Sequence, residues 1–312
     1  MKFIDWFAGI GGFRRGMELA GHECVGFCEF DKYAVMSYTA MHLCTQEQLD
    51  YLATLPLRQR QKEILKEEYR NGEWYANDVR RVYAGDVPKA DCWCFGFPCQ
   101  DISNANKLQL GFRGSRSSLF FRIMYILGQT AEEKRPTYLF IENVKNLLSV
   151  NGGWDFARLL IELDEGGYDA EWQILNSKNF GVPHNRERCF VVASFRGSDK
   201  RGILPVKGTT NGVLKGIQCD TSGKGYHSQQ DRFYLSDGIM SCLSHARPTT
   251  RHTTFINGEP HILTAKERMR LQGFTDDYIG KAYLMNEPHI IAAQAGNSVT
   301  VNVIESIARN MT

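Results

Sequence analysis

The chain has 312 residues, of which 43% are hydrophobic and 23% are charged, the proportions of an ordinary soluble globular protein. Its net charge of +2 excludes a basic surface spread over the whole chain, so any face that binds nucleic acid must be local. No apolar run reaches the roughly 18 residues that a membrane helix needs, and nine cysteines without a signal peptide predict a reduced, cytoplasmic protein.

The chain opens with a predicted strand over residues 2–6, a glycine-rich turn over 7–13 (FAGIGGF) and a helix. This order is typical of the start of a nucleotide-binding domain. A second strand ends at Glu29, whose carboxylate can accept hydrogen bonds from ribose hydroxyls. Because Arg14 occupies the third glycine position of the dinucleotide fingerprint, an adenosine ligand without a pyrophosphate fits better than NAD. A plain α/β turn is the alternative.

Residues 31–43 are predicted to be helical. Residues 46–73 have apolar side chains at helical spacing, and Pro56 divides them into two pieces. With six acidic and five basic residues this stretch is nearly neutral. We therefore expect a solvated helical hairpin, inserted at the surface over about 44–76, and no arm that binds DNA.

The run Cys92-Trp93-Cys94-Phe95 predicts a buried strand that ends at Gly96-Phe97-Pro98-Cys99-Gln100. Cys99 would then lie at the mouth of a sheet, where open α/β sheets place their chemistry. Two alternatives are a buried, inert thiol and a zinc ligand. The cysteines lack a second pair of ligands at zinc spacing, so we expect no metal.

The long polar segment 101–118 is predicted to be a lid or binding loop, and a helix follows over 119–129. A strand over 137–141 then ends at Glu142, so parallel pairing would bring Glu142 and Cys99 to one sheet edge. After a helix over 154–165 and a strand over 168–175, Arg186 and Arg188 precede a strand over 189–194. Their spacing points both side chains the same way, which suits an anion or nucleotide; two solvated arginines are the alternative.

Composition changes at Phe195. Residues 195–262 have nine basic and five acidic residues, a net of +4, with aromatic residues among the cations. They predict a small, irregular, β-rich domain suited to nucleic acid, unless they form a solvated insertion. A helix capped by Thr264 follows, and the segment 294–299 leads into a last helix.

Several of these stretches together resemble the DNA (cytosine-5)-methyltransferases of bacteria and phages. The resemblance rests on motifs that occur in the family's order along nearly the whole chain: Asp5-x-Phe7-Ala8-Gly9-x-Gly11-Gly12, Glu29, Asp78, Gly96-Phe97-Pro98-Cys99-Gln100, Glu142-Asn143-Val144, Arg186-Glu187-Arg188, Arg270-Leu271-Gln272-Gly273-Phe274 and Gln294-x-Gly296-Asn297-x-Val299.

The resemblance implies an α/β fold: a doubly wound, mostly parallel Rossmann-like sheet with a small, irregular β-rich target-recognition domain. Residues 1–195 and 263–312 would form the catalytic domain and bind S-adenosylmethionine, and residues 196–262 would recognise the target. The implied partner is double-stranded DNA, in the cleft between the domains. We expect a monomer, with a cognate restriction endonuclease as a candidate partner.

The resemblance also assigns roles to residues. The catalytic residues would be Cys99, Glu142, Arg186 and Arg188. The cofactor-binding residues would be Phe7, Ala8, Gly9, Gly11, Gly12, Glu29, Phe30, Asp78, Val79, Pro98, Leu119, Asn297 and Val299. The DNA-contacting residues would be Ser103, Arg113, Arg232, Arg247 and Arg251.

The chemistry of the family explains these residue types. A Cys99 thiolate that adds at cytosine C6 makes C5 able to attack a methyl sulfonium, and cysteine can leave again afterwards. Glu142 would assist at N3, and the two arginines would hold the base carbonyl and nearby phosphates. The base must flip out of the duplex, and the loop 101–118 would close over it.

The chain departs from the family at two positions. His184 occurs where the family has Gln, and an imidazole can still donate a hydrogen bond while responding to pH. Cys242 occurs where Thr is usual, within a degenerate element over 232–243. Two further functions remain as alternatives: an RNA (tRNA) cytosine-5 methyltransferase on the same scaffold, and a non-catalytic DNA-binding relative.

Overall fold

A computed structural model gives the fold of residues 1–98, 119–198, 202–208, 219–220, 232–235, 238–243 and 253–311. Within these ranges, seven strands form one sheet in the order β3-β2-β1-β4-β5-β8-β6. Their bounds are β1 Lys2–Trp6, β2 Glu23–Cys28, β3 Trp74–Ala76, β4 Cys92–Phe95, β5 Tyr138–Val144, β6 Tyr168–Asn176 and β8 Glu187–Phe195.

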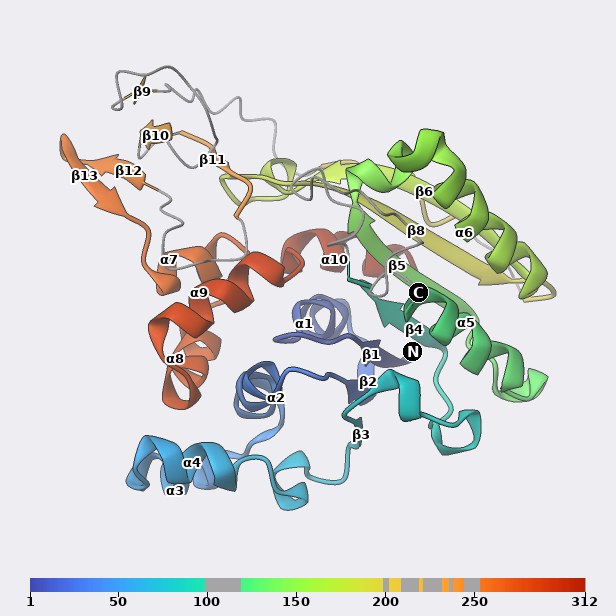
Figure 1. Cartoon of the computed structure of the whole chain (residues 1–312), viewed down its shortest axis with the longest axis horizontal. Helices are drawn as coiled ribbons and strands as arrows, with labels where there is room; N and C mark the ends of the chain where they lie inside the picture. Colours follow the sequence, from blue (N-terminus) through green and yellow to red (C-terminus); the bar gives the residue numbers. More distant parts are fainter. Residues whose placement is uncertain are drawn as a thin grey trace.

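The sheet is parallel from β3 to β5, whereas β8 runs antiparallel to both β5 and β6. Helices α5 (Leu119–Gln129) and α6 (Trp154–Glu165) cover one face, and α1 (Gly12–Leu19), α2 (Lys32–Tyr38) and α10 (Val301–Ala308) lie on the other (Figure 1). The predicted doubly wound, mostly parallel α/β fold is therefore confirmed.

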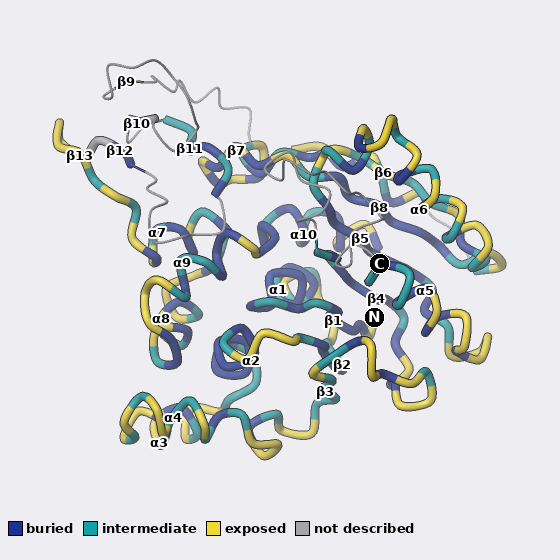
Figure 2. The backbone as a smooth tube through the Cα atoms, viewed as in Figure 1, coloured by how far each residue is buried: buried dark blue, intermediate teal, exposed yellow. Residues whose placement is uncertain are grey.

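Alternate residues of the central strands supply two separate cores, because successive strand side chains point to opposite faces. In β4, Trp93 and Phe95 pack in the core under α5 and α6, whereas Cys92 and Cys94 pack with residues of α1 and α10. In Figure 2, β5 and β8 are buried along most of their length. Cys92 and Cys94 are buried strand residues, as predicted.

The clearest differences from the predicted elements are two changed bounds and one missed strand. The strand predicted over 137–141 continues through Glu142 to Val144, because antiparallel pairing with β8 extends it. The edge strand β3 was missed, since its three residues are too few for a period-two pattern. The helix predicted over 31–43 is two elements: α2, and a π-helix at Thr39–Leu43.

The predicted helical hairpin is present as α3 (Gln46–Thr54) and α4 (Leu57–Glu63), and Pro56 separates the two helices. It is tied to α8 (Asp276–Met285), because Arg60 donates hydrogen bonds to the carbonyls of Leu52 at 2.7 Å and Leu284 at 2.6 Å. Its apolar side packs against residues of α2 and α8. The hairpin thus packs against α2 and α8 and is hydrogen-bonded to α8.

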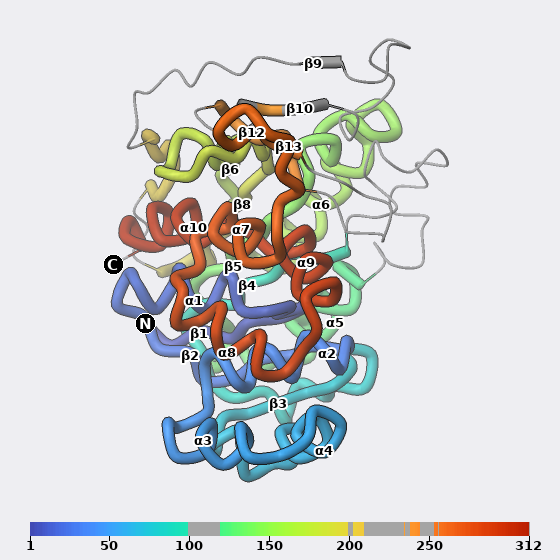
Figure 3. Tube along the Cα trace, turned by 90° about the vertical axis from the view of Figure 1, so that its left-hand side faces the viewer, coloured from blue at the N-terminus to red at the C-terminus, as the bar shows by residue number. Residues whose placement is uncertain are grey.

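A second sheet contains β9 (Cys219–Asp220), β10 (Arg232–Leu235), β12 (Thr253–Ile256) and β13 (Glu259–Ile262), in the order β13-β12-β10-β9. It lies at the end of the molecule opposite α3 and α4 in both views (Figures 1 and 3). Separately, the short strand β11 (Met240–Ser241) pairs with β7 (His184–Asn185). That pairing joins the β-rich segment to the chain between β6 and β8.

The chain returns to the large sheet through α7 (Ala265–Arg270), α8, α9 (Pro288–Asn297) and α10. A capping box begins α7: Thr264 accepts from the amide of Glu267, and the Glu267 carboxylate accepts from the amide of Thr264. This confirms the predicted cap. None of the described helices has the length and apolar character that crossing a membrane requires.

Helix α10 packs closely on α1 because glycine occupies the crossing point. A Cβ added at Gly16 would lie 2.5 Å from the Cβ of Ile304 and 2.9 Å from the Val301 carbonyl oxygen. These atoms are too close for any side chain, so the C-terminal helix can reach the N-terminal motif only across a glycine.

We predict that Gly16→Ala lowers the free energy of unfolding by roughly 1–3 kcal/mol, the usual effect of overpacking. The matched control is Gly128→Ala in α5, where an added Cβ meets nothing within 4 Å; its effect should be neutral or stabilising. Urea denaturation monitored by tryptophan fluorescence measures both variants. Equal effects of the two substitutions would contradict the close crossing of α1 and α10.

Candidate active site

The carboxyl ends of β4 and β5 lie side by side. Phe95 pairs with Ile141 in parallel register. The residues that follow them in the chain, Gly96 and Glu142, are therefore also neighbours. A Cβ added at Gly96 would lie 3.2 Å from Glu142 Oε2. The Asn143 side chain donates to the Phe97 carbonyl at 3.1 Å, which fixes the segment leading out of β4 against β5. The expected convergence of these strand ends is present.

Glu142 forms an ion pair with Arg188, whose Nε lies 3.0 Å from Glu142 Oε1. The pairing of β5 with β8 explains it: Glu142 is opposite Phe190, so Arg188, two residues away, occupies the diagonal position on the same face. Both side chains are largely buried, with exposed fractions of 11% and 15%. An ion pair so screened from water is stronger than a surface pair and fixes the carboxylate.

Arg186 makes different contacts. It is buried, and its guanidinium donates to the main-chain carbonyls of Ser298 at 2.7 Å, Gly296 at 3.3 Å and Leu243 at 3.5 Å. The two arginines therefore have different partners. Arg188 contacts the carboxylate, whereas Arg186 links its own segment to residues 296–298 and to Leu243. They meet again at Cys242, whose sulfur lies within hydrogen-bonding distance of both.

His184 is fully buried and joins two further segments. Its Nε2 accepts a hydrogen bond from the Leu243 amide at 2.9 Å, so its Nδ1 carries the proton and donates to the Leu271 carbonyl at 3.2 Å. The imidazole is thus neutral in this arrangement. A glutamine at the same position could make both bonds, with its oxygen as acceptor and its amide as donor.

The glycine turn after β1 is organised around Glu29. The amides of Gly9 and Asp31 each donate to one Glu29 carboxylate oxygen at 2.7 Å. Burial raises the pKa of Glu29, although these two hydrogen bonds act in the opposite direction. Gly9 and Gly11 have φ angles of 55° and 80°, a left-handed backbone that glycine adopts without strain, and Phe7 has the same conformation at a φ angle of 53° although it is not a glycine.

Phe30 and Asp78 follow two neighbouring strands, since each comes two residues after the paired strand ends Cys28 and Ala76. The Phe30 ring is 65% exposed, and the Arg80 guanidinium carbon lies 5.6 Å from its centroid. Arg80 donates to both carboxylate oxygens of Asp78, and these hydrogen bonds lower the pKa of Asp78. Asp78 is therefore held as an ionised acceptor. Val79 is buried in the core beneath it.

The segment after α9 packs against the glycine turn. A Cβ at Gly12 would lie 2.8 Å from Val299 Cγ2, so the two segments touch. Gln272, which is fully buried, donates to the carbonyls of Ala295 and Ser298 and holds this segment in place. Val299 is buried and Asn297 is exposed at the end of α9. The expected packing of the C-terminal motif beside the N-terminal motif is present.

The other predicted site residues have less informative positions. Ala8 is buried beside Phe27, and Leu119 begins α5 half-buried. Pro98 is the last described residue before the predicted lid over 101–118, which lies outside the described residues. Arg232 lies in β10, and only its backbone is described. The predictions for Cys99, Ser103, Arg113, Arg247 and Arg251 fall outside the described residues.

Sequence reasoning gave no individual role to three residues that hold the site together: Asn143, Gln272 and Arg80. The first two lie within the quoted motifs, so their position was a usable signal, whereas Arg80 follows Asp78 without any pattern that marks it. Each is a positioning residue whose contacts only the three-dimensional arrangement reveals.

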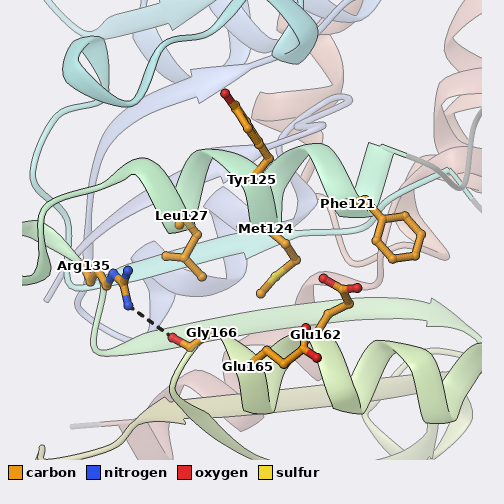
Figure 4. A pocket seen from close by; sticks show the side chains of 9 residues that line it. Phe121, Met124, Tyr125, Leu127, Arg135, Glu162, Glu165 and Gly166 are labelled. Carbon is orange, nitrogen blue, oxygen red and sulfur yellow. Dashed lines mark hydrogen bonds between the residues drawn. The ribbon is translucent and has the colours of Figure 1, made fainter.

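Two other features lie apart from this site. Within the described ranges, no group of three or more His, Cys, Asp or Glu residues could hold a metal ion. A surface cavity of about 330 Å³ lies between α5 and α6, lined by side chains that include Met124, Tyr125 and Glu162 (Figure 4). None of the predicted site residues lines it, so the candidate chemistry is not there.

A doubly wound sheet with a polar cluster at its carboxyl edge defines the Rossmann-like class of α/β proteins. The comparisons with known proteins make this specific. The family model for C-5 cytosine-specific DNA methylase matches residues 1–52, 57–256 and 206–312. The chain therefore belongs to this family, and the predicted enzyme class, a DNA (cytosine-5-)-methyltransferase, is confirmed.

Individual relatives agree with the family. The chain is 30% identical over 352 residues to the Type II methyltransferase M.HhaI of Haemophilus parahaemolyticus, covering 100% of this chain and 94% of that protein. Among solved structures, it resembles the Entamoeba histolytica methyltransferase EhMeth with a TM-score of 0.70 and 14% identity, covering 100% and 97% of the two chains. The Dnmt2 methyltransferase of S. pombe gives 0.66 at 17% identity, with 98% and 96% covered. At these identities the two structures support the fold alone.

We predict that His184→Ala lowers the free energy of unfolding by roughly 1–3 kcal/mol, because it leaves the Leu243 amide and the Leu271 carbonyl without the imidazole. His184→Gln should cost less than about 1 kcal/mol, since the amide can replace both ring nitrogens. Thermal and urea unfolding of the two variants measure the difference. A glutamine variant as unstable as the alanine variant would show that the two hydrogen bonds are not what His184 contributes.

Proposed function

We propose that the protein transfers a methyl group from S-adenosylmethionine to C5 of a flipped-out cytosine in a specific duplex DNA sequence. Cys99 adds covalently at C6, and Glu142 assists at N3. The observation that supports this most directly is the buried Glu142–Arg188 pair at the sheet edge, beside the segment Gly96–Pro98 that leads to Cys99. Glu142 thus lies beside the segment from which Cys99 follows in the chain.

The two oxygens of Glu142 have different surroundings, which suits this role. Arg188 holds Oε1, whereas Oε2 faces Gly96. A cytosine whose N3 lies at Oε2 can share a proton with it, and the negative charge that develops on the ring after thiolate addition is thereby offset. Arg188 is also the better candidate for the base carbonyl, because the Arg186 guanidinium already donates to the main-chain carbonyls of Gly296 and Ser298. The C5 proton leaves after methylation, to a water molecule.

The residues around the glycine turn fit S-adenosylmethionine. The space at the missing Cβ of Gly9 is open, since no atom lies within 4 Å, so a ligand can approach the backbone there. Glu29 has lone pairs left to accept from ribose hydroxyls, the exposed Phe30 ring can cover an adenine, and the ionised Asp78 can accept from its amino group. When bound, this group supplies an electrophilic methyl.

We include three further points in the proposal: the protein acts as a monomer, works in the cytoplasm, and has a cognate restriction endonuclease. The Type II names of its relatives support the last point. Light scattering of the protein with and without a DNA duplex tests the first.

A tRNA cytosine-5 methyltransferase is the second candidate, because one branch of this family acts on tRNA and a Dnmt2 protein shares the fold. The net positive charge of residues 195–262 favours duplex DNA. Bisulfite sequencing of DNA from cells that express the chain would report activity, target sequence and position together. Transfer of labelled methyl groups to tRNA and not to DNA would instead establish the second candidate.

A non-catalytic DNA-binding relative is the third candidate. It conflicts with the intact Glu142–Arg188 pair. Isothermal titration with S-adenosylmethionine distinguishes this candidate from the proposed enzyme. Micromolar binding supports the enzyme, and absence of binding supports the non-catalytic relative.

We predict that Cys99→Ala abolishes methyl transfer but preserves DNA binding, because it removes the thiol nucleophile and adds neither bulk nor charge. Cys44→Ala, at a half-buried position outside the predicted site residues, is the control and should keep activity. Labelled methyl transfer and electrophoretic mobility shift measure the two properties. Methylation by the Cys99→Ala protein would refute covalent catalysis.

We predict that Glu142→Gln lowers kcat by about 10²–10⁴-fold with little change in the affinity for S-adenosylmethionine, because the amide cannot share a proton at N3. Glu133→Gln, an exposed substitution far from the sheet edge, should have no effect. Steady-state kinetics and titration calorimetry provide the two quantities. Unchanged kcat in Glu142→Gln would remove Glu142 from the chemical step.

A further inference from the structure

The segment containing β11 is docked directly on the residues that carry the arginine pair. Met240 pairs with His184 in parallel register, and the Met240 amide donates to the Pro183 carbonyl at 2.8 Å. Beyond the strand, the Leu243 amide donates to His184 Nε2 at 2.9 Å. Residues 240–243 therefore lie in a fixed register against residues 183–188.

This register places Cys242 between the two guanidinium groups. Its sulfur is 3.6 Å from Arg186 Nη1 and 3.8 Å from Arg188 Nη2. The same Arg188 guanidinium uses its Nε to contact Glu142 at 3.0 Å. An uninterrupted series of contacts thus runs from the β-rich segment, through one sulfur and one arginine, to the carboxylate at the sheet edge.

We propose that Cys242 is a positioning residue whose sulfur accepts hydrogen bonds from Arg186 and Arg188 and so holds Arg188 against Glu142. The proposal rests on the proposed function, in which Glu142 acts on the base. It adds that the target-recognition segment contacts the catalytic carboxylate through one arginine. Any displacement of residues 240–243 changes how Arg188 is held.

The charge of the sulfur supports this arrangement. Burial raises the pKa of the Cys242 thiol, but the nearby Arg186 and Arg188 charges outweigh that effect and lower it overall. Burial instead raises the pKa of two other described cysteines, Cys44 and Cys189, to about 12. At neutral pH, Cys242 thus has more thiolate character than these cysteines, and a thiolate is a far better acceptor for guanidinium than a thiol.

The decisive comparison is Cys242→Thr against Cys242→Val. The two side chains have the same shape, but only threonine has an oxygen that can accept from the arginines. We expect Cys242→Val to lower kcat by at least about 10-fold and to leave KM for DNA nearly unchanged. The loss should stay smaller than the full contribution of a positioned general acid, which is about 10²–10⁴-fold. Cys242→Thr should retain most of kcat. Thermal unfolding of both variants confirms that they are folded at the assay temperature.

Two kinetic outcomes would overturn the proposal. Equal kcat values for the threonine and valine variants would show that the acceptor is irrelevant. A valine variant that raises KM with kcat intact would show that Cys242 serves DNA binding and not Glu142.

A second measurement reads the contact without methyl transfer. In the full-length protein, the pH dependence of Cys242 alkylation by iodoacetamide is followed by peptide mass spectrometry, with Arg188→Gln as the comparison. We expect a midpoint below the ordinary thiol value of about 8.5 and a higher midpoint in Arg188→Gln. A midpoint that Arg188→Gln leaves unchanged would overturn the Cys242–Arg188 contact. If the wild-type chain transferred no methyl group, the proposed function would fail, and this measurement would still decide the contact.

Discussion

The ion pair between Glu142 and Arg188 is the contact on which the site depends. Two opposite charges that are both largely buried are stable only while each faces the other, so the pair fixes the orientation of the carboxylate. The sheet enforces it, since the antiparallel pairing of β5 and β8 leaves these two side chains on one face. The parallel pairing of β4 with β5 then brings the segment that leads to Cys99 to the same carboxylate.

The remaining architecture brings distant segments to that edge. The glycines of α1 let α10 and the residues around Val299 approach the N-terminal turn, so the first and last motifs of the chain meet. Arg186 and Gln272 hold the same segment through the Ser298 carbonyl. The α3–α4 hairpin braces α8 from the outside through Arg60. These contacts are of one kind: arginine and glutamine side chains donate hydrogen bonds to main-chain carbonyls where irregular segments pass through the interior.

Much of this could be predicted from the sequence. The sequence predicted two parallel strands, one leading to Cys99 and one to Glu142, and parallel pairing implied that their ends meet. The ordered motifs identified the family. What could not be predicted has a physical cause. The different contacts of Arg186 and Arg188 depend on which main-chain carbonyls lack partners, and no local pattern encodes that. The neutral tautomer of His184 likewise depends on Leu243 and Leu271, which are far from it in sequence. Strand β3 is too short to leave a periodic signal.

The most direct test of the account is covalent trapping with duplex DNA in which the target cytosine carries fluorine at C5. The proposed elimination removes a proton from C5 after methyl transfer; fluorine cannot leave in that way, so the adduct with Cys99 should persist. Denaturing mass spectrometry with S-adenosylmethionine present should then show the mass of protein plus DNA for the wild type, far less for Glu142→Gln, and none for Cys99→Ala. A wild-type protein that methylates ordinary DNA but forms no adduct with the fluorinated duplex would contradict covalent catalysis at this sheet edge.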